Sequence, residues 1–258
     1  YPKRNFLLKV ASMWSGGKDS YLAYQAAISQ GYVIPSLVNF KWVEVEAPKP
    51  SFAMRLMGSV LSKVARKRWN YKYVPHDVNA DIIAVQAQAL GLPIVQDEVS
   101  WVTFEAQFRK TVRELGVEGV VWGAEGGQAN VHVDMLRPIS EQNNIKMIIP
   151  LAGRSEEENL KDFMQEGYEA TIIVVDSDLL SEDWLGRKVD AAFLEAIHKS
   201  SKQSGVDVSN VEFHTLATDA PLFKKRLKLV KSSVVAKKGF SVLDISKIEL
   251  VEKTKTPS

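Results

Sequence analysis

The hexapeptide SGGKDS at residues 15–20 constrains the fold of this chain more than any other segment. It lies between a short apolar run at residues 6–14 and a segment at residues 21–28 whose apolar side chains have helical spacing. The order strand, glycine turn, helix brings backbone N–H groups and the positive end of a helix to one point. Two adjacent glycines allow the sharp turn that this requires. The pattern therefore predicts a phosphate-binding loop between the first strand and the first helix.

Each residue of this loop has a chemical use. The amides of Gly16 and Gly17 can approach a phosphate closely, Lys18 adds a mobile positive charge, and Ser15 and Ser20 add hydroxyl donors. The spacing is not that of a Walker motif, which needs four residues between its first glycine and Gly-Lys-Ser/Thr. The loop therefore belongs to another class of phosphate-binding loops.

The hexapeptide, placed after a first strand, resembles the PP-loop of the ATP pyrophosphatase superfamily. The resemblance implies a Rossmann-like fold of the adenine nucleotide alpha hydrolase type, and an enzyme that cleaves ATP between its α and β phosphates. Such enzymes adenylylate a carbonyl oxygen, and a nucleophile then displaces AMP. ATP and Mg²⁺ are the implied cofactors. Lys18 and Asp19 are the expected catalytic residues, and Asp19 either binds Mg²⁺ or caps the helix.

Composition agrees with a soluble enzyme. The 258 residues are 45% hydrophobic and 25% charged, which supports an ordinary core. The absence of cysteine excludes disulfides, thiolate metal sites and cysteine nucleophiles. The four histidines include no pair at i, i+4, which argues against a histidine metal site. No apolar stretch reaches transmembrane length and no secretory signal is visible, so we expect a cytoplasmic protein without membrane contact.

The net charge of +2 is too small to indicate nucleic acid binding, but the charge is unevenly distributed. A basic segment at residues 55–72 contains no acidic residue and ends among aromatic side chains. It lies within or beside a helix predicted at residues 52–69. The segment either faces RNA or a phosphorylated surface, or is the solvated face of that helix. Its basic residues are Arg55, Lys63, Arg66, Lys67, Arg68 and Lys72.

Apolar strands alternate with amphipathic helices along the first 150 residues. The predicted strands are at 6–14, 33–40, 93–96, 119–123 and 147–151, and the predicted helices at 21–28, 52–69, 78–90 and 103–115. This alternation predicts an α/β fold with a doubly wound, mainly parallel sheet. Right-handed crossovers place the carboxyl ends of all its strands on one edge. We therefore expect the glycine loop, Asn39 and the loop after Gly123 to line one crevice.

The second part of the chain has a different pattern. A helix at 155–166 is expected to start with Ser155 as its N-cap, followed by a strand at 170–176, a helix at 190–200 and β structure at 240–251. We therefore expect a PP-loop ATP-binding domain at residues 1–150 and a smaller α+β domain on the substrate side at residues 151–258.

Two motifs in this second part narrow the family. Residues 184–190, WLGRKVD, and residues 212–223, EFHTLATDAPLF, resemble the W-L-G-R-x-x-D and E-Y-x-T-L-x-x-D-x-P-x-F patterns of the diphthine–ammonia ligase family. Together with the loop and the segment QAQALGLP at 86–93, the resemblance spans nearly the whole chain in order. It implies ATP-dependent amidation of diphthine on translation elongation factor 2, with ammonium as nitrogen donor and AMP and pyrophosphate as products.

The resemblance also implies roles for the residues around the second motif. Glu212 is the expected third catalytic residue, orienting ammonium or the trimethylammonium group of diphthine, and Phe213 offers a π face to such a cation. Thr215 and Asp219 are expected to contact the substrate. The alternative is an ordinary strand whose polar side chains satisfy turns. Asn39 lies near the adenosine by analogy, or is a turn residue at a strand end.

The chain also departs from the family patterns. Where the family has E-G-G-E-Y-E-T, residues 209–215 are SNVEFHT, with His214 in place of the last acid. After the fourth strand, the family's S-D-Y-Q-R is replaced by EGGQAN at 125–130, and Glu125 becomes a candidate substrate-binding residue. Two alternatives stay open: a related PP-loop enzyme with another acceptor such as RNA, and an ATP-binding paralogue without catalysis. A homodimer also stays open.

Overall fold

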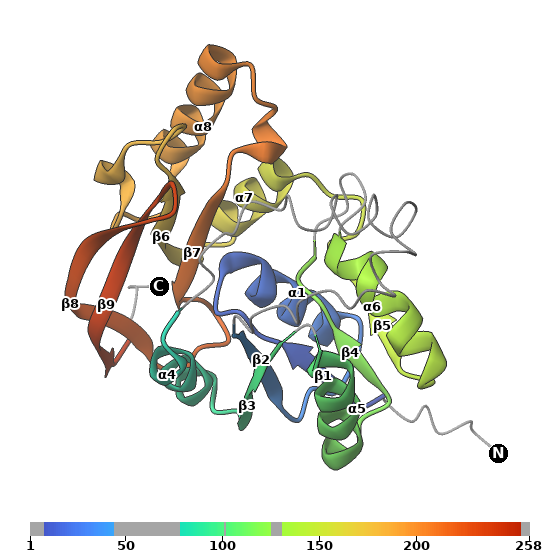
Figure 1. The fold of residues 1–258 in the computed structure, drawn as a ribbon. Helices are drawn as coiled ribbons and strands as arrows, with labels where there is room; N and C mark the ends of the chain where they lie inside the picture. Colours follow the sequence, from blue (N-terminus) through green and yellow to red (C-terminus); the bar gives the residue numbers. More distant parts are fainter. Residues whose placement is uncertain (1–7, 44–77, 101, 125–130, 254–258) are drawn as a thin grey trace, which may run out of the picture.

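Two β-sheets organise the chain in a computed structural model that describes residues 8–43, 78–100, 102–124 and 131–253. One is a five-stranded parallel sheet, and the other is a four-stranded antiparallel sheet formed by the second part of the chain (Figure 1). This architecture confirms the predicted α/β fold with an additional α+β part.

The parallel sheet has the strand order β3-β2-β1-β4-β5, and all four neighbouring pairs are parallel. Its strands are β1 (Val10–Met13), β2 (Leu37–Trp42), β3 (Ile94–Val99), β4 (Gly119–Val121) and β5 (Lys146–Ile148). Successive strands are added on one side of β1 and then on the other, so the order reverses between β1 and β4. In sheets of this kind, ligands bind outside the carboxyl ends of the strands at such a switch point.

Helices cover both faces of this sheet. They are α1 (Lys18–Ser29), α4 (Ala80–Leu90), α5 (Phe104–Leu115) and α6 (Val131–Gln142). Val10 of β1 and Trp14 directly after it pack with α1 and α4, whereas Ala11 and Met13 of β1 pack with α5 and α6. Because both faces are covered, all four residues of β1 are buried, which explains why the strand is apolar apart from Ser12.

Several bounds differ from the sequence-based expectations: β1 and β5 are shorter than predicted, and β3 continues to Val99. Helix α1 begins at Lys18 rather than residue 21, because Gly17 already serves as its N-cap. Strand β2 begins at Leu37 rather than residue 33; Pro35 has no N–H to donate, and Val33 forms only an isolated bridge. Helix α6 was not predicted, since Pro138 interrupts the helical pattern in its interior.

The antiparallel sheet has the order β7-β6-β9-β8. Its strands are β6 (Glu169–Asp176), β7 (Phe213–Asp219), β8 (Arg226–Lys237) and β9 (Phe240–Val251), and the helices of this part are α7 (Glu156–Gln165), α8 (Ala191–Ser204) and the short 3₁₀ turns η1 (Glu182–Trp184) and η2 (Val208–Asn210). The predicted helices and strands of this part are confirmed. Strand β8 was not predicted, because it is an edge strand with mostly exposed side chains and no apolar alternation.

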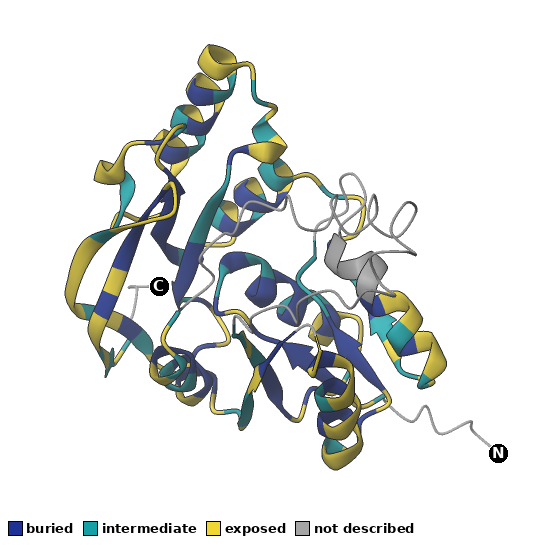
Figure 2. Cartoon of the chain, viewed as in Figure 1, coloured by how far each residue is buried: buried dark blue, intermediate teal, exposed yellow. Residues whose placement is uncertain are grey.

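One continuous cluster of buried side chains joins the two sheets. The buried residues, dark blue in Figure 2, lie on the strands of both sheets and on the helices between them. Tyr21 of α1 lies at the centre of the cluster, with its ring centroid 5.2 Å from that of Tyr168 and 5.5 Å from that of Phe223. Burial raises the pKa of the Tyr21 hydroxyl, which accepts a hydrogen bond from the Leu222 N–H. The division at residue 150 into two domains stays a prediction.

Of the helices that the structure describes, none combines the length and the apolar character that crossing a bilayer requires.

Candidate functional site

The glycine loop at residues 15–20 leaves β1 at the carboxyl edge of the parallel sheet, beside the switch point. Gly16 has a φ of +85°, a conformation that side chains disfavour, and Gly17 is the N-cap of α1 with φ −83° and ψ 175°. This N-cap residue has no side chain that could accept a hydrogen bond from the first turn. The first turn of α1 therefore presents backbone N–H groups and the positive end of the helix dipole to the edge of the sheet.

Gln86, a completely buried residue of α4, holds the loop in place. Its Nε2 donates hydrogen bonds to the Gly16 carbonyl (2.9 Å) and to the Ala217 carbonyl (2.7 Å), and its Oε1 accepts one from the Trp14 indole (3.0 Å). A Cβ at Gly16 would lie 2.5 Å from Gln86 Oε1 and 2.5 Å from Ile83. Space and backbone conformation therefore both require glycine there. Gln86 begins the segment at 86–93 that resembles the family, but its sequence context does not indicate this contact with the loop.

The loop also covers the free edge of the antiparallel sheet. The Lys18 N–H donates to Thr215 Oγ1 (3.1 Å), and the Ala217 N–H donates to the Gly16 carbonyl (2.8 Å). A Cβ at Gly17 would lie 3.1 Å from the Thr215 carbonyl oxygen. Strand β7 is an edge strand, whose outward backbone groups need partners, and the loop supplies them. The loop and the second family motif therefore meet at one place in the fold.

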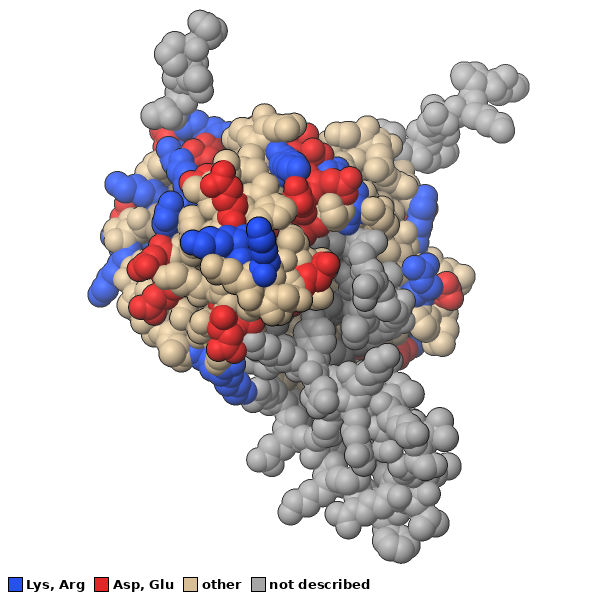
Figure 3. Space-filling model, turned by 90° about the horizontal axis from the view of Figure 1, so that it is seen from above, with Lys and Arg blue, Asp and Glu red and all other residues tan. Residues whose placement is uncertain are grey.

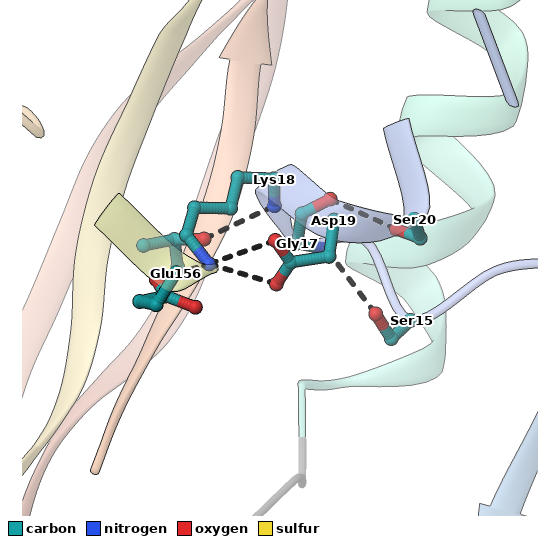
Figure 4. Close-up of polar contacts among 7 residues, drawn as sticks. Ser15, Gly17, Lys18, Asp19, Ser20 and Glu156 are labelled. Carbon is teal, nitrogen blue, oxygen red and sulfur yellow. Dashed lines mark hydrogen bonds and ion pairs between the residues drawn. The ribbon is translucent and has the colours of Figure 1, made fainter. Parts of the chain in front are cut away.

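The ammonium group of Lys18 lies between two carboxylates (Figure 4). Its Nζ is 2.8 Å from both carboxylate oxygens of Asp19 and 2.7 Å from Oε1 of Glu156. The three side chains are 4%, 29% and 13% exposed, respectively. Lys18 also lies over the Phe213 ring, 5.2 Å from its centroid. Nothing in the sequence indicates that Glu156 reaches this site, because an acidic residue in the first turn of a helix is explained by the helix dipole alone.

A cavity of about 230 Å³ opens beside the loop. It brings together residues from the loop, the end of β4, the start of α4, and strands β6 to β9. Seven residues predicted for the site line it: Ser15, Gly17, Lys18, Asp19, Gly123, Phe213 and Thr215. Its remaining polar lining includes Asn79, His214, Lys237 and Asp244, beside apolar side chains from α4, β6 and β9.

Gly123 brings the end of β4 into contact with the first turn of α1. A Cβ at this position would lie 2.7 Å from the backbone carbonyl of Asp19 and 2.7 Å from the backbone nitrogen of Ser20. No real Cβ approaches backbone atoms so closely. Only glycine at this position therefore allows the end of β4 to pack against the first turn of α1.

Several predicted site residues do not line the cavity. Ser20 lies in the first turn of α1, and its hydroxyl donates to the Gly17 carbonyl (2.8 Å). Asn39 lies within β2, paired with Gln96 of β3, so the alternative of a turn residue at a strand end is wrong. Its Nδ2 donates to the Trp14 carbonyl (2.8 Å). Their contacts with a nucleotide stay predictions.

The two predicted acids around β7 lie at its opposite ends. Glu212 directly precedes the strand, where its carbonyl accepts a hydrogen bond from the Asp176 N–H (3.0 Å). Asp219 ends the strand and forms an ion pair with Lys253 (3.0 Å). Neither lines the cavity, and their roles stay predictions. Glu125 lies outside the described residues.

The described surface carries charges of both signs. On the face above α8, Lys and Arg side chains alternate with Asp and Glu, and neither sign forms a continuous patch among the residues described there (Figure 3). The basic segment at residues 55–72 and the helix predicted at residues 52–69 lie outside the described residues, so the RNA-binding hypothesis stays a prediction.

The fold and the site together define a class of α/β protein. In this class, a glycine loop leads into the N-terminus of a helix at the switch point of a parallel sheet. Comparison with known proteins narrows this class. Residues 52–147 match the protein-family model of the diphthamide synthase N-terminal domain, and residues 155–251 match that of the diphthamide synthase C-terminal domain. The chain belongs to the diphthine–ammonia ligase family, as a divergent member.

Individual relatives agree with this assignment at low identity. The chain is similar to diphthine–ammonia ligase of Homo sapiens, with 24% identity over 276 residues, and to that of Bos taurus, with 23% identity. Each match covers 95% of this chain and 91% of the relative. A crystal structure of a predicted subunit of tRNA methyltransferase from Methanocaldococcus jannaschii aligns over 83% of this chain and 98% of its own. Its TM-score of 0.37 and 13% identity are too low to support any argument.

Proposed function

We propose that this protein is an ATP-dependent amide ligase that converts the carboxylate of diphthine on translation elongation factor 2 into an amide. Ammonium supplies the nitrogen, and AMP and pyrophosphate are released. The observation that carries the proposal is the junction between the glycine loop and β7. Lys18 donates a hydrogen bond to Thr215, and both residues line the same cavity. A nucleotide on the loop and an acceptor on β7 would therefore meet. A cytoplasmic location, where translation takes place, follows from the proposal.

The loop residues fit the phosphates of ATP. Helix α1 begins at a glycine N-cap that has no side chain, and Lys18 supplies a positive charge beside it. These are the features of an anion site at a helix N-terminus. Asp19 would hold Mg²⁺ in part. Within the described segments, no group of three or more His, Asp or Glu side chains gathers around a metal site. Proteins commonly bind Mg²⁺ through one or two carboxylates together with substrate phosphates, and Asp19 would be such a carboxylate.

The first step of the proposed reaction activates the carboxylate. A carboxylate is a poor acyl donor, because its leaving group would be an oxide. When its oxygen bonds to the α-phosphorus, the bond from that phosphorus to the oxygen of pyrophosphate breaks, and negative charge grows on pyrophosphate. The amides at the start of α1 and the Lys18 ammonium would stabilise that charge. Mg²⁺, when bound, adds further positive charge at the phosphates.

The second step forms the amide. Ammonium first loses a proton to give ammonia, whose electron pair then attacks the activated acyl carbon. AMP leaves with the electrons of the broken C–O bond, and the nitrogen loses a second proton to solvent. The position of Phe213 is consistent with an acceptor substrate that carries a positive charge. Its ring lies 5.2 Å from the Lys18 ammonium, so a cation can lie over its face. The trimethylammonium group of diphthine would use the same ring. We assign Glu212 to orienting ammonium and Thr215 and Asp219 to acceptor binding.

The test follows α-labelled ATP with Mg²⁺ and ammonium, with and without elongation factor 2 that carries diphthine. We expect AMP only when the factor is present, together with conversion of its carboxylate to an amide detected by mass spectrometry. Lys18→Ala should abolish both products. Lys110→Ala, which removes an exposed lysine of α5, is the matched control and should leave both unchanged.

Three results would overturn the proposal in different ways. AMP formed without the factor, or only after RNA is added, would indicate another acceptor. ATP binding without AMP under any condition would indicate a paralogue without catalysis. AMP formation that persists in Lys18→Ala would remove the role assigned to the loop lysine.

A further inference from the structure

We propose that Glu156 is a positioning residue that holds the Lys18 ammonium and makes nucleotide binding depend on a divalent cation. The inference rests on the proposed ATP-dependent function. It concerns a residue from the opposite part of the chain, on α7, that reaches the glycine loop of the parallel sheet. The Lys18–Glu156 contact of 2.7 Å is the observation that carries it.

The backbone around Glu156 is fixed by a capping box. The Ser155 hydroxyl accepts a hydrogen bond from the Glu158 N–H (3.2 Å), and the Glu158 carboxylate accepts one from the Ser155 N–H (2.7 Å). Glu156 is the first residue of α7, directly after this N-cap. Its side chain points inward and is largely buried. The carboxylate is therefore held at Lys18 rather than free to reach solvent.

Two carboxylates face the one ammonium group of Lys18. The ammonium group contacts two carboxylates, so Lys18, Asp19 and Glu156 together carry a net negative charge beside the start of α1. A triphosphate that approaches this helix end would be attracted by the helix dipole and Lys18, and repelled by the two carboxylates. The repulsion scales with the charge of the ligand. Free ATP carries roughly twice the negative charge of its complex with a divalent cation, so the carboxylates disfavour free ATP more strongly.

Glu157 is a natural comparison for Glu156. Both acidic residues lie near the positive end of the α7 dipole, but only the Glu156 side chain contacts Lys18. Glu157 occupies the same first turn of α7, but its carboxylate lies 2.6 Å from Lys161 and 3.4 Å from His198. It is also the more exposed of the two. Glu157→Gln therefore changes the net charge in the same way as Glu156→Gln, on the same helix turn, without touching Lys18. It is the matched control.

Titration calorimetry of ATP with Mg²⁺, and with a chelator in its place, tests the effect on binding. We expect Glu156→Gln to tighten binding of free ATP about tenfold and of the magnesium complex about threefold, since the lost repulsion scales with ligand charge. The ratio of the affinity for the magnesium complex to the affinity for free ATP then falls about threefold. Glu157→Gln should leave both affinities within about twofold of the wild type. Glu156→Asp, which retains the charge on a shorter side chain, should keep most of the wild-type preference.

Lysine labelling supplies a readout that does not need the nucleotide. Reductive methylation followed by peptide mass spectrometry should label the buried Lys18 slowly in the wild type and several times faster in Glu156→Gln. Glu157→Gln should instead accelerate labelling of Lys161. A melting curve for each variant establishes that the fold is intact.

The outcomes separate the two proposals. An unchanged preference for the magnesium complex in Glu156→Gln, or unchanged labelling of Lys18, would overturn the inference about Glu156. A wild-type protein that binds ATP in neither condition would instead refute the proposed function and, with it, the dependence on a divalent cation.

Discussion

Replacing Gln86 with leucine would remove one buried amide that contacts three parts of the molecule. The amide donates to Gly16 in the glycine loop and to Ala217 in β7, and it accepts from Trp14 after β1. Leucine has a similar size but no polar atoms. The change therefore isolates the hydrogen bonds from the packing.

The structure sets the size of the expected effect. Without Gln86, the Gly16 carbonyl keeps its hydrogen bond from the Ala217 N–H (2.8 Å), but the Trp14 indole N–H and the Ala217 carbonyl each lose one. Each buried polar group left unsatisfied costs about 1–3 kcal/mol, so we expect the free energy of unfolding to fall by about 2–6 kcal/mol. That is a large share of the stability of a typical domain.

Gln86→Glu adds a pH dependence with a defined sign. The introduced carboxylate would face the carbonyl oxygens of Gly16 and Ala217, which raises its pKa above the ordinary value for glutamate. A raised pKa in the folded state stabilises the protein at low pH, and this contribution is lost as the pH rises through that pKa. The variant should therefore be less destabilised at about pH 5 than at about pH 7. Gln88→Glu, at an exposed position of the same helix, should show no such difference.

Urea unfolding followed by tryptophan fluorescence and circular dichroism measures these free energies. A Gln86→Leu variant within about 0.5 kcal/mol of the wild type would refute the reasoning, because a change that small is typical of a surface position. A pH dependence in Gln86→Glu no larger than that of Gln88→Glu would refute the assignment of the amide donors.

Three further changes test other parts of the fold. Gly123→Ala places a Cβ 2.7 Å from the backbone of the first turn of α1, so we expect a loss of about 1–3 kcal/mol in urea unfolding and weaker ATP binding in calorimetry. Burial raises the pKa of Tyr21 above its ordinary value of 10.0, so the stabilisation from its protonated hydroxyl is lost as the pH rises above that value. In unfolding experiments above about pH 10, Tyr21→Phe should therefore lose less stability with rising pH than the wild type does. Ser155→Ala removes the N-cap of α7 and should cost about 1 kcal/mol, and an unchanged unfolding midpoint would contradict the capping role.

The sequence by itself determined the local features of this protein. The glycine pair between an apolar strand and an amphipathic helix located the loop, because only glycine adopts the positive φ of Gly16 easily. Strand and helix periodicity predicted the parallel sheet, since periodicity reports which residues of a segment face the core. Segments without that signal were missed: β8 is an exposed edge strand, and α6 contains Pro138.

Only the tertiary structure decided which parts of the chain meet at the loop. Lys18 and Thr215 are 197 positions apart, and Trp14 and Gln86 are 72 apart, yet both pairs are hydrogen-bonded. Periodicity indicates that a residue is buried but not against which partner. The partners follow from the docking of the edge strand β7 onto the loop, which satisfies backbone groups that both segments would otherwise leave unpaired. Glu156 reaches Lys18 for the same reason: the packing of α7 beside α1 fixes the contact, and no pattern within either helix encodes it.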